Sequence, residues 1–279
     1  MSLLGAAEIR ALAQSLDLKP SKSLGQNFVI DANVCRKIVR TAGVSADDIA
    51  LEIGPGLGSL TLAMMEEAKA VIAVEIDPRL AQQLPITVAA HSNSSAKLTV
   101  IHHDALTIKE LPAAPTVLVA NLPYNVSVPV FLHLLEIFPT LRSGVVMVQA
   151  EVADRLAAKP NTKEYGIPSV KAAWWADVSN AGSVSRSIFW PAPNVDSKLV
   201  GFTRRQTPGD EALRKQVFAI IDLAFAQRRK MLRSALSSMY GGSSAAEVVL
   251  SSAGIDPTLR GEALDIQAFC KIAKQGLGS

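Results

Sequence analysis

The stretch that decides the fold is Ile49-Ala50-Leu51-Glu52-Ile53-Gly54-Pro55-Gly56-Leu57-Gly58-Ser59-Leu60-Thr61. It opens with a short apolar run typical of a buried strand. A glycine-rich turn follows, and the chain then continues as a predicted helix through Met65. Strand, glycine turn and helix together indicate the nucleotide-binding opening of a doubly wound α/β sheet. Gly54 and Gly56 let the backbone come close to a ligand, but their G-x-G-x-G spacing differs from that of dinucleotide enzymes.

Acidic residues end the next two predicted strands. The strand at 70–74 leads to Glu75, which lies 21 residues after Gly54, where an acid can accept hydrogen bonds from both hydroxyls of a ribose. The strand at 98–102 leads to Asp104, which can accept from the amino group of an adenine. Because ligands of open α/β sheets bind outside the carboxyl ends of the strands, these acids predict a site for an adenosine-type ligand.

A fourth predicted strand, at 116–120, leads into Asn121-Leu122-Pro123-Tyr124. The Asn121 side-chain oxygen and the Leu122 backbone oxygen can each accept one hydrogen of an exocyclic NH2 group. Pro123 restricts Leu122 to extended geometry and so directs its carbonyl group. Tyr124 offers a face on which a splayed-out base can stack. A strand that simply ends in a proline turn is the alternative interpretation of this tetrapeptide.

Composition and charge narrow the class of protein. The chain has 279 residues, of which 49% are hydrophobic, so a sizeable core is expected. Cys35 and Cys270 lie far apart, and the four histidines show no ligand spacing with them, so we expect reduced thiols and no metal site. No apolar run reaches membrane-spanning length and no signal pattern opens the chain, so we expect a cytoplasmic protein that does not enter a membrane.

The composition changes after about residue 205. We expect a nucleotide-binding α/β domain at 1–205 and a small helical domain at 206–279. Residues 204–279 hold 11 Lys and Arg against 7 Asp and Glu, whereas residues 1–203 hold 17 against 18. A basic C-terminal part hints at a polyanionic partner, although a charge run can also be a solvated face. The polar loop at 159–166 is a candidate lid. Phe189, before a proline-rich turn, is a candidate second face for a stacked base.

Several motifs together resemble one family. In chain order they are Leu24-Gly25-Gln26-Asn27-Phe28, Glu52-Ile53-Gly54-Pro55-Gly56-Leu57-Gly58, Glu75-Ile76-Asp77, Asp104-Ala105, Asn121-Leu122-Pro123-Tyr124-Asn125, Pro191-x-Pro193-x-Val195-x-Ser197 and Phe225-Ala226-Gln227-Arg228-Arg229-Lys230. This set resembles the small-subunit ribosomal RNA adenine dimethyltransferases. The resemblance implies a Rossmann-like class I S-adenosylmethionine-dependent methyltransferase domain with a small all-helical C-terminal domain. It also implies dimethylation of N6 on two adjacent adenines in the 3′-terminal hairpin of small-subunit (16S) rRNA.

The resemblance assigns roles by position. Asn27 and Val29 would contact the cofactor from the N-terminal loop, Gly54 would lie against its methionine end, Glu75 would hold the ribose and Asp104 the adenine. Asn121 would meet both the cofactor and the target amine, and Tyr124 and Phe189 would sandwich the target base. The family usually has Leu where Val29 stands, and a backbone contact survives that change. The residues expected to contact RNA are Lys22, Arg228, Arg229, Lys230 and Arg233.

The expected partner is small-subunit rRNA within an immature small ribosomal subunit, bound by a monomer. Other readings share part of this logic. A DNA adenine methyltransferase has the same cofactor and target amine, an Erm-type enzyme modifies large-subunit rRNA, and a non-catalytic RNA-binding factor would use the fold without the chemistry. A nicotinamide dehydrogenase is disfavoured by the glycine spacing and by the tetrapeptide that begins at Asn121.

Overall fold

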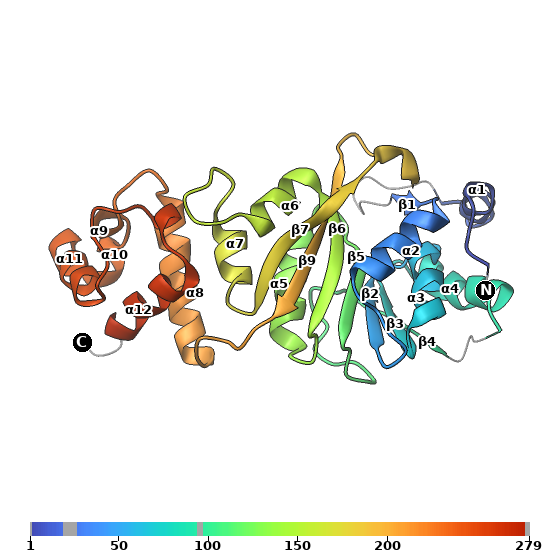
Figure 1. Ribbon diagram of the computed structural model, residues 1–279, viewed down its shortest axis with the longest axis horizontal. Coiled ribbons are helices and arrows are strands. Elements are labelled where there is room, and N and C mark those ends of the chain that lie inside the picture. The colour runs from blue at the N-terminus through green and yellow to red at the C-terminus, as the bar shows by residue number, and fades with distance from the viewer. Residues whose placement is uncertain (1, 19–26, 94–96, 277–279) are drawn as a thin grey trace. The chain divides into compact units, whose positions relative to one another are not determined.

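The computed structural model describes residues 2–18, 27–93 and 97–276 (Figure 1). The chain divides into two compact units. Unit 1 comprises Met1–Ala153 and Ser179–Arg204, and unit 2 comprises Asp154–Val178 and Arg205–Ser279. The sequence predicted a single division after residue 205. The contacts also place residues 154–178 with the C-terminal helices, because this segment packs its aromatic side chains there.

A seven-stranded sheet forms the centre of the fold, with strand order β4-β3-β2-β5-β6-β9-β7. Its strands are β2 (Ile49–Ile53), β3 (Ala70–Glu75), β4 (Leu98–His102), β5 (Val117–Asn121), β6 (Ser143–Gln149), β7 (Ala176–Val184) and β9 (Ser197–Arg204). Neighbours from β4 to β6 pair in parallel, and β9 pairs antiparallel with β6. A separate two-stranded ribbon joins β1 (Phe28–Val29) to β8 (Phe189–Trp190). The predicted doubly wound sheet is therefore confirmed.

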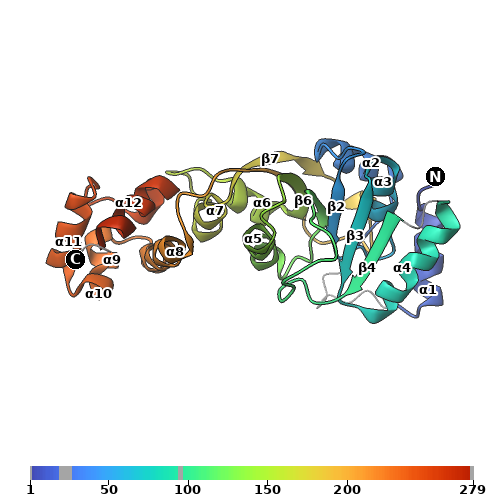
Figure 2. The ribbon, with the colours of Figure 1, turned by 90° about the horizontal axis from the view of Figure 1, so that it is seen from below.

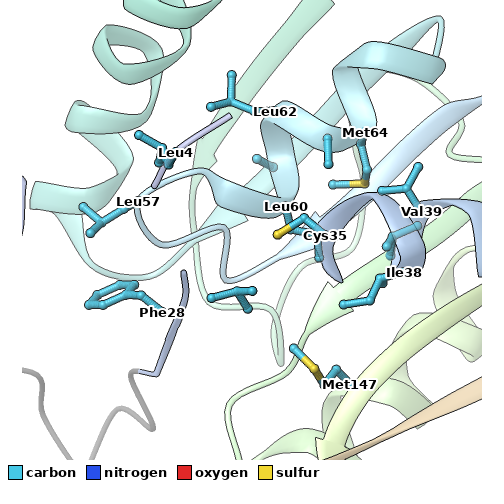
Figure 3. Packing of buried hydrophobic residues seen from close by; sticks show 14 of the residues in the cluster. Leu4, Phe28, Cys35, Ile38, Val39, Leu57, Leu60, Leu62, Met64 and Met147 are labelled. Carbon is cyan, nitrogen blue, oxygen red and sulfur yellow. The ribbon is translucent and has the colours of Figure 1, made fainter. Parts of the chain in front are cut away.

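The helices of unit 1 cover both faces of this sheet. They are α1 (Ala6–Ser15), α2 (Ala32–Thr41), α3 (Ser59–Glu67), α4 (Pro78–His91) and α5 (Ser127–Ile137). The helix α6 (Ala150–Ala157) follows β6, and the division between the two units falls within it, after Ala153. Val117 and Val119 of β5 join a buried cluster with side chains of α1 to α4, part of which Figure 3 shows. Leu118 alternates to the other face, where Phe131 of α5 contacts Phe202 of β9, their ring centroids 5.4 Å apart. Figure 2 shows β2, β3 and β4 side by side near α4.

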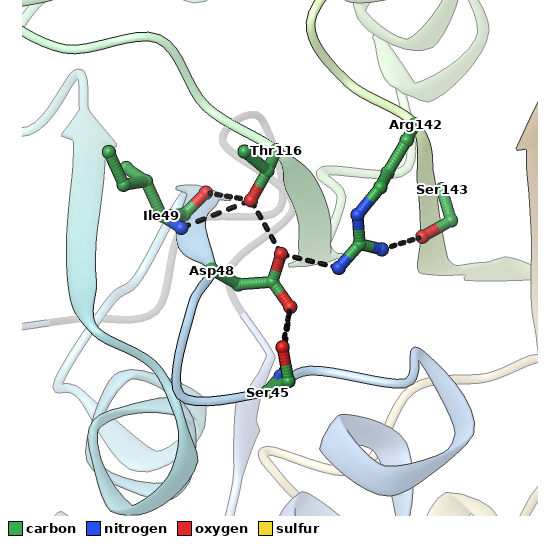
Figure 4. Close-up of polar contacts among 6 residues, drawn as sticks. All are labelled: Ser45, Asp48, Ile49, Thr116, Arg142 and Ser143. Atoms are coloured by element: carbon green, nitrogen blue, oxygen red, sulfur yellow. Dashed lines mark hydrogen bonds and ion pairs between the residues drawn. The ribbon is translucent and has the colours of Figure 1, made fainter.

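A buried carboxylate ties the amino ends of three strands together (Figure 4). Asp48 is 2% exposed and accepts hydrogen bonds from Thr116 Oγ1 at 2.7 Å, Ser45 Oγ at 2.8 Å and Arg142 Nη2 at 2.5 Å. Burial alone would raise the pKa of Asp48, but these donors outweigh burial and hold the pKa below its usual range. The carboxylate therefore links the segments that lead into β2, β5 and β6, at the amino-terminal edge of these strands.

Unit 2 is mostly helical. Its helices are α7 (Ile167–Ala172), α8 (Glu211–Ala226), α9 (Leu232–Ala235), α10 (Ser237–Tyr240), α11 (Ser243–Ser252) and α12 (Ile266–Gly276). Trp174 and Trp175 both meet the ring of Phe218 edge-on, with centroids 6.2 and 5.4 Å away. These aromatic contacts attach the 154–178 segment to α8, and the two tryptophans serve packing, as the sequence indicated.

The polar loop at 159–166 is tied down within unit 2. The Tyr165 hydroxyl donates to the Leu264 carbonyl at 2.7 Å, and the Asn161 N–H donates to the Glu262 carbonyl at 2.9 Å. Arg228 Nη2 donates to the Lys163 carbonyl at 2.8 Å. The sequence made this loop a candidate lid, but its bonds to the C-terminal segment argue against free movement.

Candidate active site

A pocket opens at the carboxyl edge of the parallel strands, entirely within unit 1. Its empty space is about 960 Å³ with the open mouth included. The pocket receives residues from the ends of β2, β3, β4 and β5 and from the β1 segment. The predicted site residues that line it are Asn27, Val29, Gly54, Gly56, Glu75, Asp104, Asn121 and Pro123. The structure therefore brings together residues spread over almost 100 positions of sequence.

The glycine turn lies against both the strand-end acid and the tetrapeptide. Gly56 has φ +58°, a conformation that favours glycine, and its N–H donates to Glu75 Oε2 at 3.2 Å. Gly54 has φ +67°, and a Cβ there would lie 3.9 Å from both the Asn121 carbonyl oxygen and the Pro123 ring. This proximity follows from the pairing of β2 with β5, which places the two turns next to each other.

Glu75 and Asp104 keep acceptor capacity toward the pocket. Glu75 Oε1 accepts the N–H groups of Ile76 and Asp77, each at 2.9 Å, and its side chain is 5% exposed. Burial raises the pKa of Glu75, and the backbone donors offset part of this effect. Asp104 Oδ1 accepts from the Leu106 N–H at 2.8 Å, while Oδ2 has no hydrogen-bond partner among the described residues. Each carboxylate oxygen has two lone pairs, so both acids can accept further bonds from a ligand.

Asn121, the last residue of β5, has one satisfied and one unsatisfied end. Its Nδ2 donates to the Asn27 carbonyl oxygen at 3.0 Å. Its Oδ1 is the one buried side-chain nitrogen or oxygen of the described residues that lacks a hydrogen-bond partner. Buried polar atoms are nearly always paired, so an unpaired acceptor in a pocket indicates a position for a ligand donor.

The residues after Asn121 form a firmly held corner. The Leu122 N–H donates to the Met147 carbonyl at 3.0 Å, whereas no described group donates to the Leu122 carbonyl. The Tyr124 hydroxyl and Ser197 Oγ lie 2.9 Å apart and share a hydrogen bond. Ser197 is fully buried on β9. Burial also raises the pKa of the Tyr124 phenol. The corner thus carries two free acceptors and a ring whose hydroxyl is anchored.

Phe189 is placed differently from the predicted residues that line the pocket. Phe189 is 3% exposed, pairs with Val29 in the β1–β8 ribbon and belongs to the hydrophobic cluster, so its ring has no free face for a base. Val29 lines the pocket, but its carbonyl accepts from Ser59 Oγ at 2.7 Å. A sandwich of Tyr124 and Phe189 around a base would therefore require the ring of Phe189 to become exposed.

Sequence reasoning gave no role to Glu52, which also lines the pocket. Glu52 is 1% exposed, and its Oε2 accepts from Thr61 Oγ1 at 2.5 Å. The pKa of Glu52 is raised to about 8: burial is the main cause, the hydrogen bond from Thr61 opposes it, and the nearby charge of Glu75 adds to it. The sequence does contain a signal for this residue, because an acidic side chain is unusual within an apolar run such as that of β2.

The predicted RNA-contacting residues of unit 2 fall into two groups. Arg228 forms an ion pair with Glu262 at 2.8 Å besides its bond to the loop at 159–166, and Arg233 pairs with Glu247 at 2.9 Å. Arg229 and Lys230 are exposed and have no acidic partner among the described residues. Lys22 lies outside the described residues. Of the predicted RNA contacts that the structure describes, Arg229 and Lys230 are therefore free to meet a phosphate, while Arg228 and Arg233 are already engaged in ion pairs.

Comparison with known proteins identifies the family. The family model for the ribosomal RNA adenine dimethylases matches residues 18–275. The chain belongs to this family. It is 59% identical over 275 residues to the ribosomal RNA small subunit methyltransferase A of Leifsonia xyli subsp. xyli, covering 98% of each chain. It is 58% identical to the protein of the same name from Thermobifida fusca, covering 98% of this chain and 96% of the relative.

Solved structures carry the same fold. A dimethyladenosine transferase from Plasmodium falciparum superposes with a TM-score of 0.75 at 24% identity, covering 89% of this chain and 98% of that one. The 23S rRNA methyltransferase ErmE superposes with a TM-score of 0.67 at 25% identity, covering 89% and 99%. The predicted Rossmann-like methyltransferase fold and the predicted adenine dimethylase family are therefore confirmed.

Two features are missing from the part of the chain that the structure describes. No three His, Cys, Asp or Glu side chains of that part of the chain are grouped so that they could hold a metal ion. None of the helices formed by those residues has the length and apolar character needed to cross a membrane.

Proposed function

We propose that this protein transfers methyl groups from S-adenosylmethionine to N6 of two adjacent adenines in the 3′-terminal hairpin of small-subunit (16S) rRNA during ribosome biogenesis. The observation that carries the proposal is the buried, unpaired Oδ1 of Asn121 at the end of β5. The backbone of Asn121 lies beside the glycine turn, where a nucleotide-type cofactor binds in open α/β sheets. An amine held at Oδ1 would therefore be next to the cofactor.

The residues of the pocket fit S-adenosylmethionine. Glu75 would accept hydrogen bonds from its ribose hydroxyls, and Asp104 would accept from its adenine amino group. Gly54 and Gly56 leave room for close backbone approach, and Asn27 and Val29 bound the pocket from the β1 side. When bound, the cofactor would supply an electrophilic sulfonium methyl group, and the adenine N6 that accepts it would lose one proton to solvent.

The corner at Asn121–Tyr124 would prepare the target amine. The lone pair of adenine N6 is delocalised into the ring, which makes N6 a weak nucleophile. Asn121 Oδ1 and the Leu122 carbonyl would each accept one N6 hydrogen and favour a pyramidal nitrogen with its lone pair aimed at the methyl group. Placement of the amine and local polarity then lower the barrier. Tyr124 would stack on the flipped base.

A second methylation uses the same groups. After the first transfer N6 keeps one hydrogen, which one of the two acceptors can still hold. The other acceptor then faces the first methyl group, so the pocket must leave room for it there. The product with two methyl groups has no N6 hydrogen left, and loss of both hydrogen bonds would favour its release.

The RNA would also meet unit 2. Arg229 and Lys230 carry unpaired positive charge, which suits the phosphate backbone. We infer that the partner is the immature small ribosomal subunit, that the enzyme binds it as a monomer, and that it acts in the cytoplasm.

The deciding experiment uses a methyl-labelled cofactor and small subunits that lack the modification, followed by mass mapping of the modified bases. Two adjacent N6,N6-dimethyladenines near the 3′ end are expected. The Asn121→Ala variant should abolish transfer while binding the cofactor with nearly unchanged affinity in calorimetry. Modification of protein-free large-subunit rRNA or of duplex DNA instead would overturn the assignment of the substrate.

A further inference from the structure

The side-chain amide of Asn121 is held in one of two possible orientations. An asparagine amide can turn by a half rotation, which exchanges its oxygen and its NH2 group. Here the group next to it is the Asn27 carbonyl oxygen, 3.0 Å from Nδ2. A carbonyl oxygen can only accept a hydrogen bond, so the amide must turn its NH2 group toward Asn27. The same choice leaves Oδ1 buried and without a partner, on a residue that lines the pocket.

The carbonyl that makes this choice belongs to a firmly anchored segment. Ser59 Oγ, from the first turn of α3, donates to the Val29 carbonyl at 2.7 Å. The β1 strand pairs with β8, and the Ile30 N–H donates to the Ile188 carbonyl at 2.8 Å. The ring of Phe28, next to Asn27, is 7% exposed in the hydrophobic cluster. Strand pairing, a buried hydroxyl and a buried ring therefore keep the Asn27 carbonyl in place.

We propose that the Asn27 carbonyl is a positioning group for methyl transfer: it fixes the amide of Asn121 so that Oδ1, and not the NH2 group, meets the target amine. This inference rests on the proposed function, in which Asn121 touches the N6 hydrogens. If the amide turned around, its NH2 group would face another donor and could hold no N6 hydrogen. The β1 segment thereby takes part in the reaction through a backbone atom.

The Asn121→Asp variant tests this role because it keeps the shape of the side chain. An ionised aspartate has no donor for the Asn27 carbonyl, and two acceptors would face each other. A protonated aspartic acid restores the original pattern, donating its hydroxyl to Asn27 and offering its carbonyl to the amine. Burial and the facing carbonyl oxygen should raise the pKa of this acid. The variant should therefore work better when protonated.

The measurement is the single-turnover rate of the variant divided by that of the wild type, at saturating cofactor and RNA, between about pH 5.5 and 8. Four other titratable groups line the pocket, namely Glu52, Glu75, His103 and Asp104, and the ratio cancels their effects on both proteins. The ratio should rise at least about fivefold as the pH falls. This factor corresponds to the net free energy of one ordinary hydrogen bond, the one that the protonated side chain would regain to the Asn27 carbonyl.

Opposite results separate the explanations. If the Asn27 contact is incidental, the ionised carboxylate is the better acceptor, and the ratio should rise with pH. A ratio that rises with pH overturns the proposal. A ratio that does not change with pH also overturns it, whether or not the variant is active. If the wild type itself transfers no methyl group to rRNA, the proposed function fails, and the ratio has no meaning.

A second variant addresses the anchor. Ser59→Ala removes the hydroxyl that holds Val29 without touching Asn121. We expect the single-turnover rate to fall about fivefold, with the cofactor Kd changed less than about twofold. Ser59→Thr, which keeps a hydroxyl, should recover part of the rate. A rate equal to that of the wild type, or a loss seen only in the cofactor Kd, would show that the anchor does not act on Asn121.

Discussion

Tyr124 and Ser197 can each lose a hydroxyl group without losing the rest of the side chain's shape, which makes their 2.9 Å hydrogen bond accessible to a double-mutant cycle. The variants are Tyr124→Phe, Ser197→Ala and the combination of both. We expect the bond to hold the Tyr124 ring at the angle needed to stack on the target adenine. The cycle separates this role from a contribution to stability alone.

The structure sets the size of each effect. Ser197 is fully buried, so Tyr124→Phe leaves a buried hydroxyl without this partner, which costs about 1–3 kcal/mol of folding stability. Ser197→Ala leaves the hydroxyl of Tyr124, which is only partly buried, and should cost about 1 kcal/mol. The double variant leaves neither group unpaired, so most of the stability should return.

The rate of methyl transfer should behave differently. All three variants free the ring, so each should react about fivefold more slowly, corresponding to about 1 kcal/mol of lost orientation. Urea unfolding gives the stabilities, and single-turnover assays with saturating RNA and cofactor give the rates. If the double variant recovers its rate along with its stability, or if no variant is slowed, the ring does not depend on Ser197 for its position.

Three further outcomes are expected. Glu52→Gln should stabilise the fold increasingly between about pH 5 and 8, by at most about 5 kcal/mol. Because the pKa of Glu52 is raised in the fold, this acid ionises in the unfolded chain over that range while the native state keeps it protonated, so the wild type loses stability as the pH rises. Urea unfolding across this pH range should show the growing difference, and a constant difference would contradict it. Asp48→Asn should destabilise unit 1 by about 2 kcal/mol at neutral pH. Because the pKa of Asp48 is lowered in the fold, the difference in stability from the wild type should shrink as the pH falls through that pKa. Equal denaturation midpoints of the two proteins at neutral pH would contradict this. Arg228→Ala should lower the thermal midpoint of unit 2, because it removes the ion pair with Glu262. Arg229→Ala should leave that midpoint unchanged, but it should weaken RNA binding and reduce the slope of log Kd against log salt concentration by about 1. The reverse pattern would refute this division of roles.

The sheet and the strand-end polar residues could be predicted because their signals are local. Apolar runs mark the strands, and parallel strands bring their carboxyl ends to one edge, so Gly54, Glu75, Asp104 and Asn121 were expected to meet. Element ends differ slightly: the strand predicted at 116–120 runs to Asn121, which places this side chain on the sheet edge itself.

Other parts of the site leave no local signal. The contact that orients Asn121 joins residues 94 positions apart and uses a backbone carbonyl of Asn27, which any amino acid would supply. Arg228 looks like its neighbour Arg229 in sequence, and only the folded chain shows that Glu262 faces one of them. Phe189 suits a base platform or a core equally well, and in the structure it packs in the core. Pairings of this kind depend on tertiary structure and cannot be read from composition or spacing.

The pairing of β2 with β5 fixes the distance between the two turns that follow these strands. Adjacent strands lie about 4.8 Å apart, a spacing set by backbone hydrogen bonds and indifferent to side-chain identity. The backbone ladder between β2 and β5 therefore sets the separation between the glycine turn and the corner at Asn121–Tyr124. Surface helices and distant loops could therefore change in length, through evolution or by engineering, without changing the distance between the glycine turn and the corner, across which the methyl group is transferred.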